Sequence, residues 1–211
     1  MNQAADIRNR LQRVARERKI DMQLLLTTYG IQRMLHRLGQ TSHARRYVLK
    51  GAQRLQALAS EHVFRATRDV DLAAWSNPST DALRQVMLDL ANLDEDDGLE
   101  FDVDSLVVEE ILDRTAYGGL RGRMQAYLDG ARIPLRLDVG FGDALVPDPV
   151  PIQMRTLLDM PAPDLRGYAP ETVVAEKLQA LTALSLINSR LKDYYDLWFI
   201  ANHVHVDEDV L

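Results

Sequence analysis

The sequence predicts an α+β fold in which helices near both ends of the chain flank a central β-sheet. Three observations support this prediction. Apolar residues recur at helical spacing near both ends, polar and apolar residues alternate in the middle, and a dipeptide there favours a hairpin turn. A length of 211 residues with 46% apolar residues suits one domain, or one domain with a helical appendage.

The helices follow from apolar periodicity and from residues that begin helices. Pro170 suits the first turn of one helix, and Asn188-Ser189 could cap the last one. The expected helical ranges are 3–19, 21–38, about 51–58, 81–93, 170–184 and 190–202.

The strands lie between these helices, and alternating residues identify most of them. Asp129-Gly130 favours a tight turn and so predicts that the strands on either side form a hairpin. The acidic stretch 94–98 is expected to be a solvated turn. The expected strands are 47–49, 68–72, 121–127 and 132–139, and we divide the chain into an N-terminal helical segment (1–45), a core (46–165) and a C-terminal helical part (166–211).

Composition excludes disulfides, thiolate metal sites and cysteine nucleophiles, but it leaves the role of the basic N-terminal segment open. The chain has no cysteine, no apolar run long enough to span a membrane and no signal-peptide core, so a cytoplasmic protein is expected. Residues 1–50 carry a charge balance of +8 and the remaining residues −14. This asymmetry fits either a basic arm that binds nucleic acid or a helix with solvated arginines.

Three aspartates are candidate metal ligands. Asp69 and Asp71 are two apart in a predicted strand, so their carboxylates share a face and repel each other unless a cation lies between them. Mg²⁺ is commonly held by one or two carboxylates together with substrate phosphates. Asp138 has the same parity in a second strand and would join the pair if the strands are neighbours. The alternative is an exposed strand face with solvated acids.

Two further segments carry polar groups suited to phosphate chemistry. Gly51-Ala52 follows a strand and opens a helix, which presents backbone N–H groups to an anion. Lys177 lies in an otherwise apolar helix and either reaches solvent or contacts phosphates. Asp193 and Asp196 share one side of the last helix, whose packing face is expected to contain Tyr194, Leu197, Trp198 and Ala201. No histidine spacing, P-loop or G-x-S-x-G motif supports another chemistry.

Five motifs resemble those of the AbiEii-type nucleotidyltransferase toxins, the toxin halves of abortive-infection toxin–antitoxin systems. The resemblance spans roughly residues 24–200, and the last two motifs are the most specific. The motifs are Tyr47-Val48-Leu49-Lys50-Gly51, Arg68-Asp69-Val70-Asp71-Leu72, Asp138-Val139-Gly140-Phe141-Gly142-Asp143, Ala175-Glu176-Lys177-Leu178 and Asn188-Ser189-Arg190-Leu191-Lys192-Asp193-Tyr194-Tyr195-Asp196-Leu197.

The resemblance implies a polymerase-β-like nucleotidyltransferase fold with a mixed sheet, N-terminal helices and a helical C-terminal part. It implies an enzyme that uses NTP with Mg²⁺ (or Mn²⁺) to modify the 3′ end of tRNA and so block translation. A transcriptional-regulator antitoxin is the implied partner. By motif, the implied catalytic residues are Asp69, Asp71, Lys177 and Asp193; the metal ligands Asp69, Asp71 and Asp138; the nucleotide-binding residues Lys50, Gly51, Ala52, Lys177 and Lys192; and the further candidates Asp196, Arg190 and Arg68.

The sequence departs from the family pattern in two ways. Gly51-Ala52-Gln53 stands where the family usually has Gly-Gly or Gly-Ser followed by Thr, so backbone N–H groups would have to bind phosphate without a hydroxyl. The family also has helices beyond the position of residue 211, so the C-terminal part is expected to be truncated. Two alternatives therefore stay open: a nucleotidyltransferase acting on a protein or small molecule, and a catalytically silent module that binds a partner.

Overall fold

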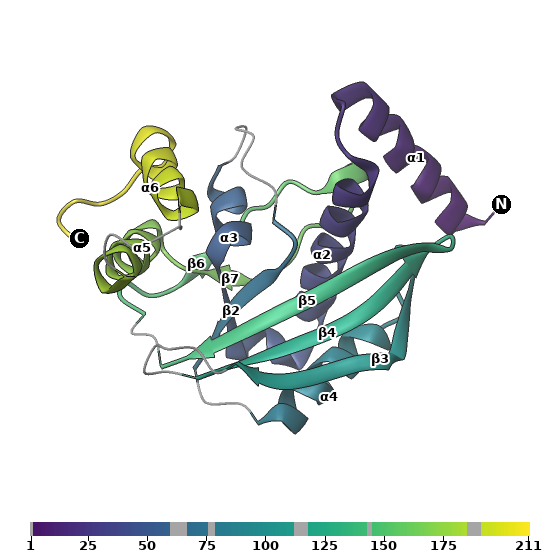
Figure 1. The fold of residues 1–211 in the computed structure, drawn as a ribbon, viewed down its shortest axis with the longest axis horizontal. Coiled ribbons are helices and arrows are strands. Elements are labelled where there is room, and N and C mark those ends of the chain that lie inside the picture. The colour runs from purple at the N-terminus through teal and green to yellow at the C-terminus, as the bar shows by residue number, and fades with distance from the viewer. Residues whose placement is uncertain (1, 60–66, 76–78, 112–117, 143–144, 185–190) are drawn as a thin grey trace.

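The computed structural model describes residues 2–59, 67–75, 79–111, 118–142, 145–184 and 191–211. Within these residues the strands form one mixed sheet in the order β3-β4-β5-β2-β1-β7-β6. Helices cover it, with α5 and α6 on the side of the molecule away from α1 (Figure 1). The strands are β1 (Tyr47–Lys50), β2 (Val70–Ala74), β3 (Leu99–Ile111), β4 (Gly119–Leu128), β5 (Ala131–Phe141), β6 (Val150–Pro151) and β7 (Arg166–Gly167).

The helices begin at capping residues where the sequence supplies them. Asn2, Asp21 and Ser79 each accept a hydrogen bond from a backbone N–H in the first turn of the helix that follows. The helices are α1 (Gln3–Arg18), α2 (Met22–Gln40), α3 (Gly51–Leu58), α4 (Thr80–Ala91), α5 (Pro170–Leu184) and α6 (Leu191–His203), with short 3₁₀ turns η1 (Ser42–Arg46) and η2 (Leu157–Asp159). None of the helices in the described residues is long and apolar enough to cross a membrane.

The centre of the sheet joins strands from distant parts of the sequence. β2 pairs with β5 in parallel, whereas β1–β2, β3–β4 and β4–β5 are antiparallel. The β4–β5 hairpin turns at Asp129 and Gly130, which have φ angles of 47° and 73°. Positive φ at both positions is typical of the two-residue turn that the dipeptide predicted. The turn fixes which β4 residue faces each β5 residue.

Two apolar clusters occupy the two sides of β1. The larger cluster packs α1, α2 and α4 against the sheet and includes Leu49 of β1. The smaller cluster includes Val48 of β1 and packs it against Leu55, Val173 and Phe199 from α3, α5 and α6. The smaller cluster therefore attaches the two C-terminal helices to β1 and α3.

The α+β prediction and most predicted elements are confirmed, with shifted ends. The predicted strand 68–72 is β2 at residues 70–74, so Asp69 immediately precedes the strand. β3 and the short strands β6 and β7 were not predicted, and β7 lies within the segment assigned to the C-terminal helical part. The division into 1–45, 46–165 and 166–211 stays a prediction, and the Asn188-Ser189 cap lies outside the described residues.

The acidic stretch 94–98 is a turn, but its prediction as solvated was wrong for Asp97. This side chain is fully buried and accepts two hydrogen bonds from Arg37, each 2.9 Å long. Arg33 is also buried, with its Nε 3.8 Å from the same carboxylate. The paired charges compensate each other's desolvation. Part of the positive charge of residues 1–50 is therefore structural and does not face a partner.

Candidate active site

The parallel pairing of β2 and β5 brings the predicted carboxylates together. Asp71 and Asp138 are direct partners in the register, and Asp69 stands one residue before β2. The Thr67 hydroxyl donates a 2.6 Å hydrogen bond to Asp69 Oδ1 and so orients that carboxylate. The expectation that the two strands are neighbours is confirmed.

Gly51, the first residue of α3, packs directly against Asp71. Its φ of 63° lies in the left-handed region, which favours glycine. A Cβ built on Gly51 would lie 2.8 Å from both Cβ and Cγ of Asp71 and closer still to Oδ2. No side chain caps the start of α3. The glycine thus lets the N-terminal backbone of a helix approach the carboxylate closely.

The buried and negatively charged surroundings of Asp71 favour the protonated form of its carboxyl group. Burial, together with the negative charges of Asp69, Asp138 and Glu176, raises the pKa of Asp71 to about 6, and Lys50 offsets part of this effect. This carboxyl group therefore lies in a negative environment that a bound cation would relieve.

Asp138 has a different environment, because two arginines hold it. Arg121 donates two hydrogen bonds of 2.8 Å to its oxygens, and Arg136 donates two of 3.1 and 2.6 Å. Burial alone would raise the pKa of Asp138, but the hydrogen bonds from Arg121 and Arg136 hold it below its ordinary value. Sequence reasoning missed both arginines.

Lys177 neither reaches solvent nor stands free in the cavity. The residue is only 8% exposed, and its ammonium group lies 2.8 Å from Asp193 Oδ1 and 2.7 Å from Asp196 Oδ2. Both aspartates are fully buried. This cluster joins α5 to α6 beside the cavity, and it was not predicted as a unit.

The packing face predicted for α6 was wrong. Its buried side carries Asp193, Asp196, Phe199 and Ile200, whereas Trp198 is 56% exposed. The Lys177 ion cluster takes the inward position that apolar periodicity had assigned to aromatic rings. Of the predicted packing residues, Tyr194 and Ala201 are also exposed.

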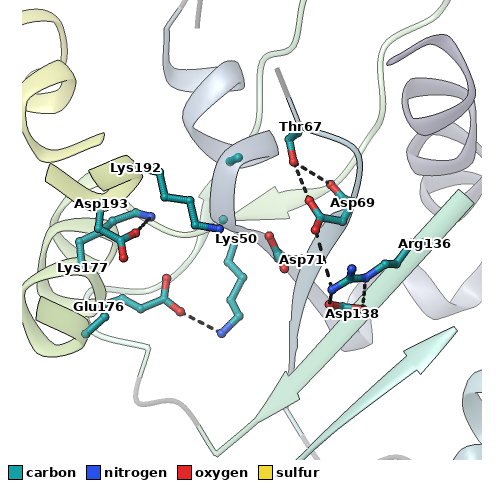
Figure 2. Close-up of a pocket in the computed structure, with 13 residues that line it drawn as sticks. Lys50, Thr67, Asp69, Asp71, Arg136, Asp138, Glu176, Lys177, Lys192 and Asp193 are labelled. Atoms are coloured by element: carbon teal, nitrogen blue, oxygen red, sulfur yellow. Dashed lines mark hydrogen bonds and ion pairs between the residues drawn. The ribbon is translucent and has the colours of Figure 1, made fainter. Parts of the chain in front are cut away.

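The carboxylates near β2 and β5, the Gly51 turn and the Lys177 ion cluster border one cavity of about 510 Å³. Figure 2 shows Lys192 extending from α6 into it, and Lys50 bonded to Glu176 across a distance of 2.9 Å. The lining residues are Lys50, Gly51, Ala52, Thr67, Asp69, Asp71, Arg136, Asp138, Glu176, Lys177, Ala180, Lys192 and Asp193.

Two of the described sequence candidates do not line this cavity. Asp196 is buried and ion-paired with Lys177, and Arg68 is exposed to solvent. Arg190 lies outside the described residues. Arg136, Glu176 and Thr67 line the cavity without having been predicted. Arg136 shares strand parity with Asp138, a signal that was available in the sequence.

The carboxylates of Asp69 and Asp71 fit a hard divalent cation that also binds phosphate. Among the described residues no group of three or more His, Cys, Asp or Glu side chains is arranged to hold a metal ion. Asp69 and Asp71 nevertheless supply two carboxylates, and both line the cavity together with Gly51. Two carboxylates completed by substrate phosphates are a usual Mg²⁺ site.

The comparison that identifies the family covers most of the chain. A family model for the nucleotidyl transferase AbiEii toxin of type IV toxin–antitoxin systems matches residues 33–211. This chain belongs to the AbiEii family. It is therefore a nucleotidyltransferase, and toxin–antitoxin membership implies an antitoxin as partner.

Solved structures support the fold of this AbiEii protein. JHP933 from Helicobacter pylori is similar with a TM-score of 0.57 and 19% identity, over 87% of this chain and 68% of that one. Another solved structure, of a predicted nucleotidyltransferase from H. pylori, gives a TM-score of 0.54 and 20% identity, over 87% of this chain and 70% of that one. No curated protein matches this AbiEii chain in sequence.

Proposed function

We propose that this enzyme transfers a nucleoside monophosphate from an NTP to the 3′ end of a tRNA and thereby blocks translation in the cytoplasm. The observation that supports this most directly is the single cavity that joins Asp69 and Asp71 to the Gly51 turn and to Lys192. Asp69 and Asp71 would hold Mg²⁺ or Mn²⁺, whereas Asp138, the third residue of the predicted ligand set, is bonded to two arginines. The bound ion would activate the acceptor hydroxyl and neutralise charge on the leaving pyrophosphate.

The protein's own groups would bind and orient the NTP. The N-terminus of α3 at Gly51 and Ala52 presents backbone N–H groups, and a helix N-terminus favours anions. Lys192 would add a positive charge, as would Lys50 when a phosphate competes with Glu176 for it. Catalysis would then come mainly from positioning and charge neutralisation.

The acceptor assignment rests on the toxin family and on exposed positive charge. Arg13, Arg16 and Arg18 of α1 are exposed, unlike Arg33 and Arg37. These three arginines would contact RNA phosphates. Gln53, where the family usually has a hydroxyl-bearing residue, is 2% exposed, so phosphate contacts at this turn would come from the backbone.

The test is label transfer from each of four α-³²P-NTPs to total tRNA with Mg²⁺, comparing wild type with Asp71→Asn. Label on tRNA from wild type alone is the expected result. Label on a protein or on a small molecule would show that the acceptor is that molecule and not tRNA. Wild-type protein that binds no NTP would refute the enzyme assignment and favour a module that binds a partner.

A further inference from the structure

Asp138 has no capacity left for another ligand as it stands. Each of its two oxygens accepts one hydrogen bond from Arg121 and one from Arg136. A carboxylate has about four acceptor positions, and four donors occupy them. The three charged groups together carry a net charge of +1. Asp138 therefore offers no free acceptor position to a cation, and its two arginines more than balance its charge.

The two arginines differ in where they lie. Arg121 faces Asp138 across the β4–β5 register and does not line the cavity, whereas Arg136 does. The Nη2 atom of Arg136 is also 3.9 Å from Asp69 Oδ2. Figure 2 shows the Arg136 guanidinium between Asp69 and Asp138.

The bonds to Asp138 use only one edge of the Arg136 guanidinium. Nε and Nη2 donate to Asp138, while Nη1 donates no hydrogen bond to any residue that the structure describes. The group is thus fixed in orientation and keeps N–H donors available. Two other cavity cations are also paired with carboxylates, Lys177 with Asp193 and Asp196 and Lys50 with Glu176.

We propose that Arg136 binds the triphosphate of the incoming NTP and that Asp138 is a positioning residue. Asp138 and Arg121 together hold the Arg136 guanidinium at the cavity wall, so Asp138 does not ligate the metal. A planar guanidinium with fixed orientation loses little entropy when it binds phosphate oxygens in pairs. This inference rests on the proposed function and assigns a phosphate contact to that same site.

The experiment measures nucleotide binding and metal binding separately. Calorimetry with ATP, GTP, CTP and UTP in Mg²⁺ identifies the best-bound NTP and gives its Kd for wild type, Arg136→Gln, Arg136→Lys and Asp138→Asn. Electron paramagnetic resonance gives the Mn²⁺ affinity of the same proteins and of Asp71→Asn without nucleotide. Arg123→Gln is the matched control, because Arg123 stands opposite Arg136 on β4 but bonds to Glu109 and does not line the cavity.

Arg136→Gln is expected to weaken NTP binding by about tenfold or more, the usual range for a lost charged hydrogen bond. Arg136→Lys should recover only part of that loss, and Arg123→Gln should match wild type. Asp138→Asn should weaken NTP binding while leaving Mn²⁺ affinity unchanged. If Arg136→Gln does not fold, weaker NTP binding with normal Mn²⁺ affinity in Arg136→Lys supports the assignment.

Two results overturn the inference while the proposed function stands. One is wild-type NTP affinity in a folded Arg136 variant. The other is a loss of Mn²⁺ affinity in Asp138→Asn as large as that in Asp71→Asn, which would make Asp138 a metal ligand. If wild type itself binds no NTP, the proposed function fails, and this inference fails with it.

Discussion

At the scale of single residues, Asp71 is the most constrained group of the candidate site. It faces Asp138 across two parallel strands and packs against the backbone of Gly51. Its neighbours favour the protonated form, and its pKa is about 6. An ionised Asp71 without a cation therefore destabilises the folded chain, and the destabilisation depends on pH.

Asp71→Asn is expected to stabilise the metal-free protein at pH 8 by about 1–3 kcal/mol. The pKa of Asp71 is raised from 3.8 to about 6 on folding, so its contribution to stability is fully present below pH 4 and is lost as pH rises through 6. Urea unfolding at pH 4 and pH 8 with a chelator measures this, and the variant should gain little at pH 4. An equal or lower stability of Asp71→Asn at pH 8 would contradict the electrostatic account.

Gly51→Ala should lower NTP affinity by tenfold or more and destabilise the fold by about 1–3 kcal/mol. The substitution combines an unfavourable positive φ with a methyl group that overlaps Asp71. Gly130→Ala is the matched control, since Gly130 has a φ of 73° but nothing lies within 4 Å of its added Cβ. Calorimetry and urea unfolding of both variants separate backbone strain from the overlap. Equal effects of the two substitutions would show that the overlap is irrelevant.

At the scale of elements, a buried ion cluster lies in the contact between α5 and α6. Lys177 is ion-paired with both Asp193 and Asp196, and both aspartates are fully buried. Removing the cation would leave two like charges buried and close together. Such a loss costs more than the loss of an exposed ion pair.

Lys177→Met is expected to destabilise the protein by about 3–5 kcal/mol, measured by urea unfolding at pH 7.5. Its neighbour Glu176 provides the control, because Glu176→Gln removes a partly exposed ion pair with Lys50 and should cost about 1 kcal/mol or less. A Lys177→Met variant as stable as Glu176→Gln would show that the cluster does not hold the two helices together.

Strand parity predicted the carboxylate face of the site, and a further count along the hairpin could have predicted its arginines. A two-residue turn at Asp129-Gly130 pairs Leu128 with Ala131, and the same register places Arg121 opposite Asp138. The sequence therefore contained the Arg121–Asp138 contact, although strand periodicity alone did not identify it.

Other features depend on tertiary contacts that a local pattern does not contain. β3 lies at the edge of the sheet, and its acidic side chains interrupt the apolar alternation that identifies strands. The orientation of α6 depends on Lys177, which lies on another helix. Asp97 was assigned to solvent because its partners, Arg33 and Arg37, are about sixty residues away in the sequence.

At the scale of the whole molecule, the candidate site combines residues from the sheet region with residues from the two C-terminal helices. Asp71 and Asp138 come from the sheet and Asp69 from the residue before β2, whereas Lys177, Lys192 and Asp193 come from α5 and α6. The C-terminal helices are attached through the smaller cluster, while the larger one packs the sheet against α1, α2 and α4. The cavity wall formed by the sheet is therefore held by the larger apolar cluster, and the wall formed by α5 and α6 is held by the smaller one.

This difference predicts that the two walls of the cavity open at different rates. Amide protons of α5 and α6 should exchange with deuterium faster than those of β4 and β5, because a smaller apolar cluster costs less to open. An NTP with Mg²⁺ that contacts both walls should slow exchange in α5 and α6 by more than in the sheet. Equal protection of both walls would indicate one cooperative unit. Under the expected outcome, bound nucleotide holds the C-terminal helices against the sheet.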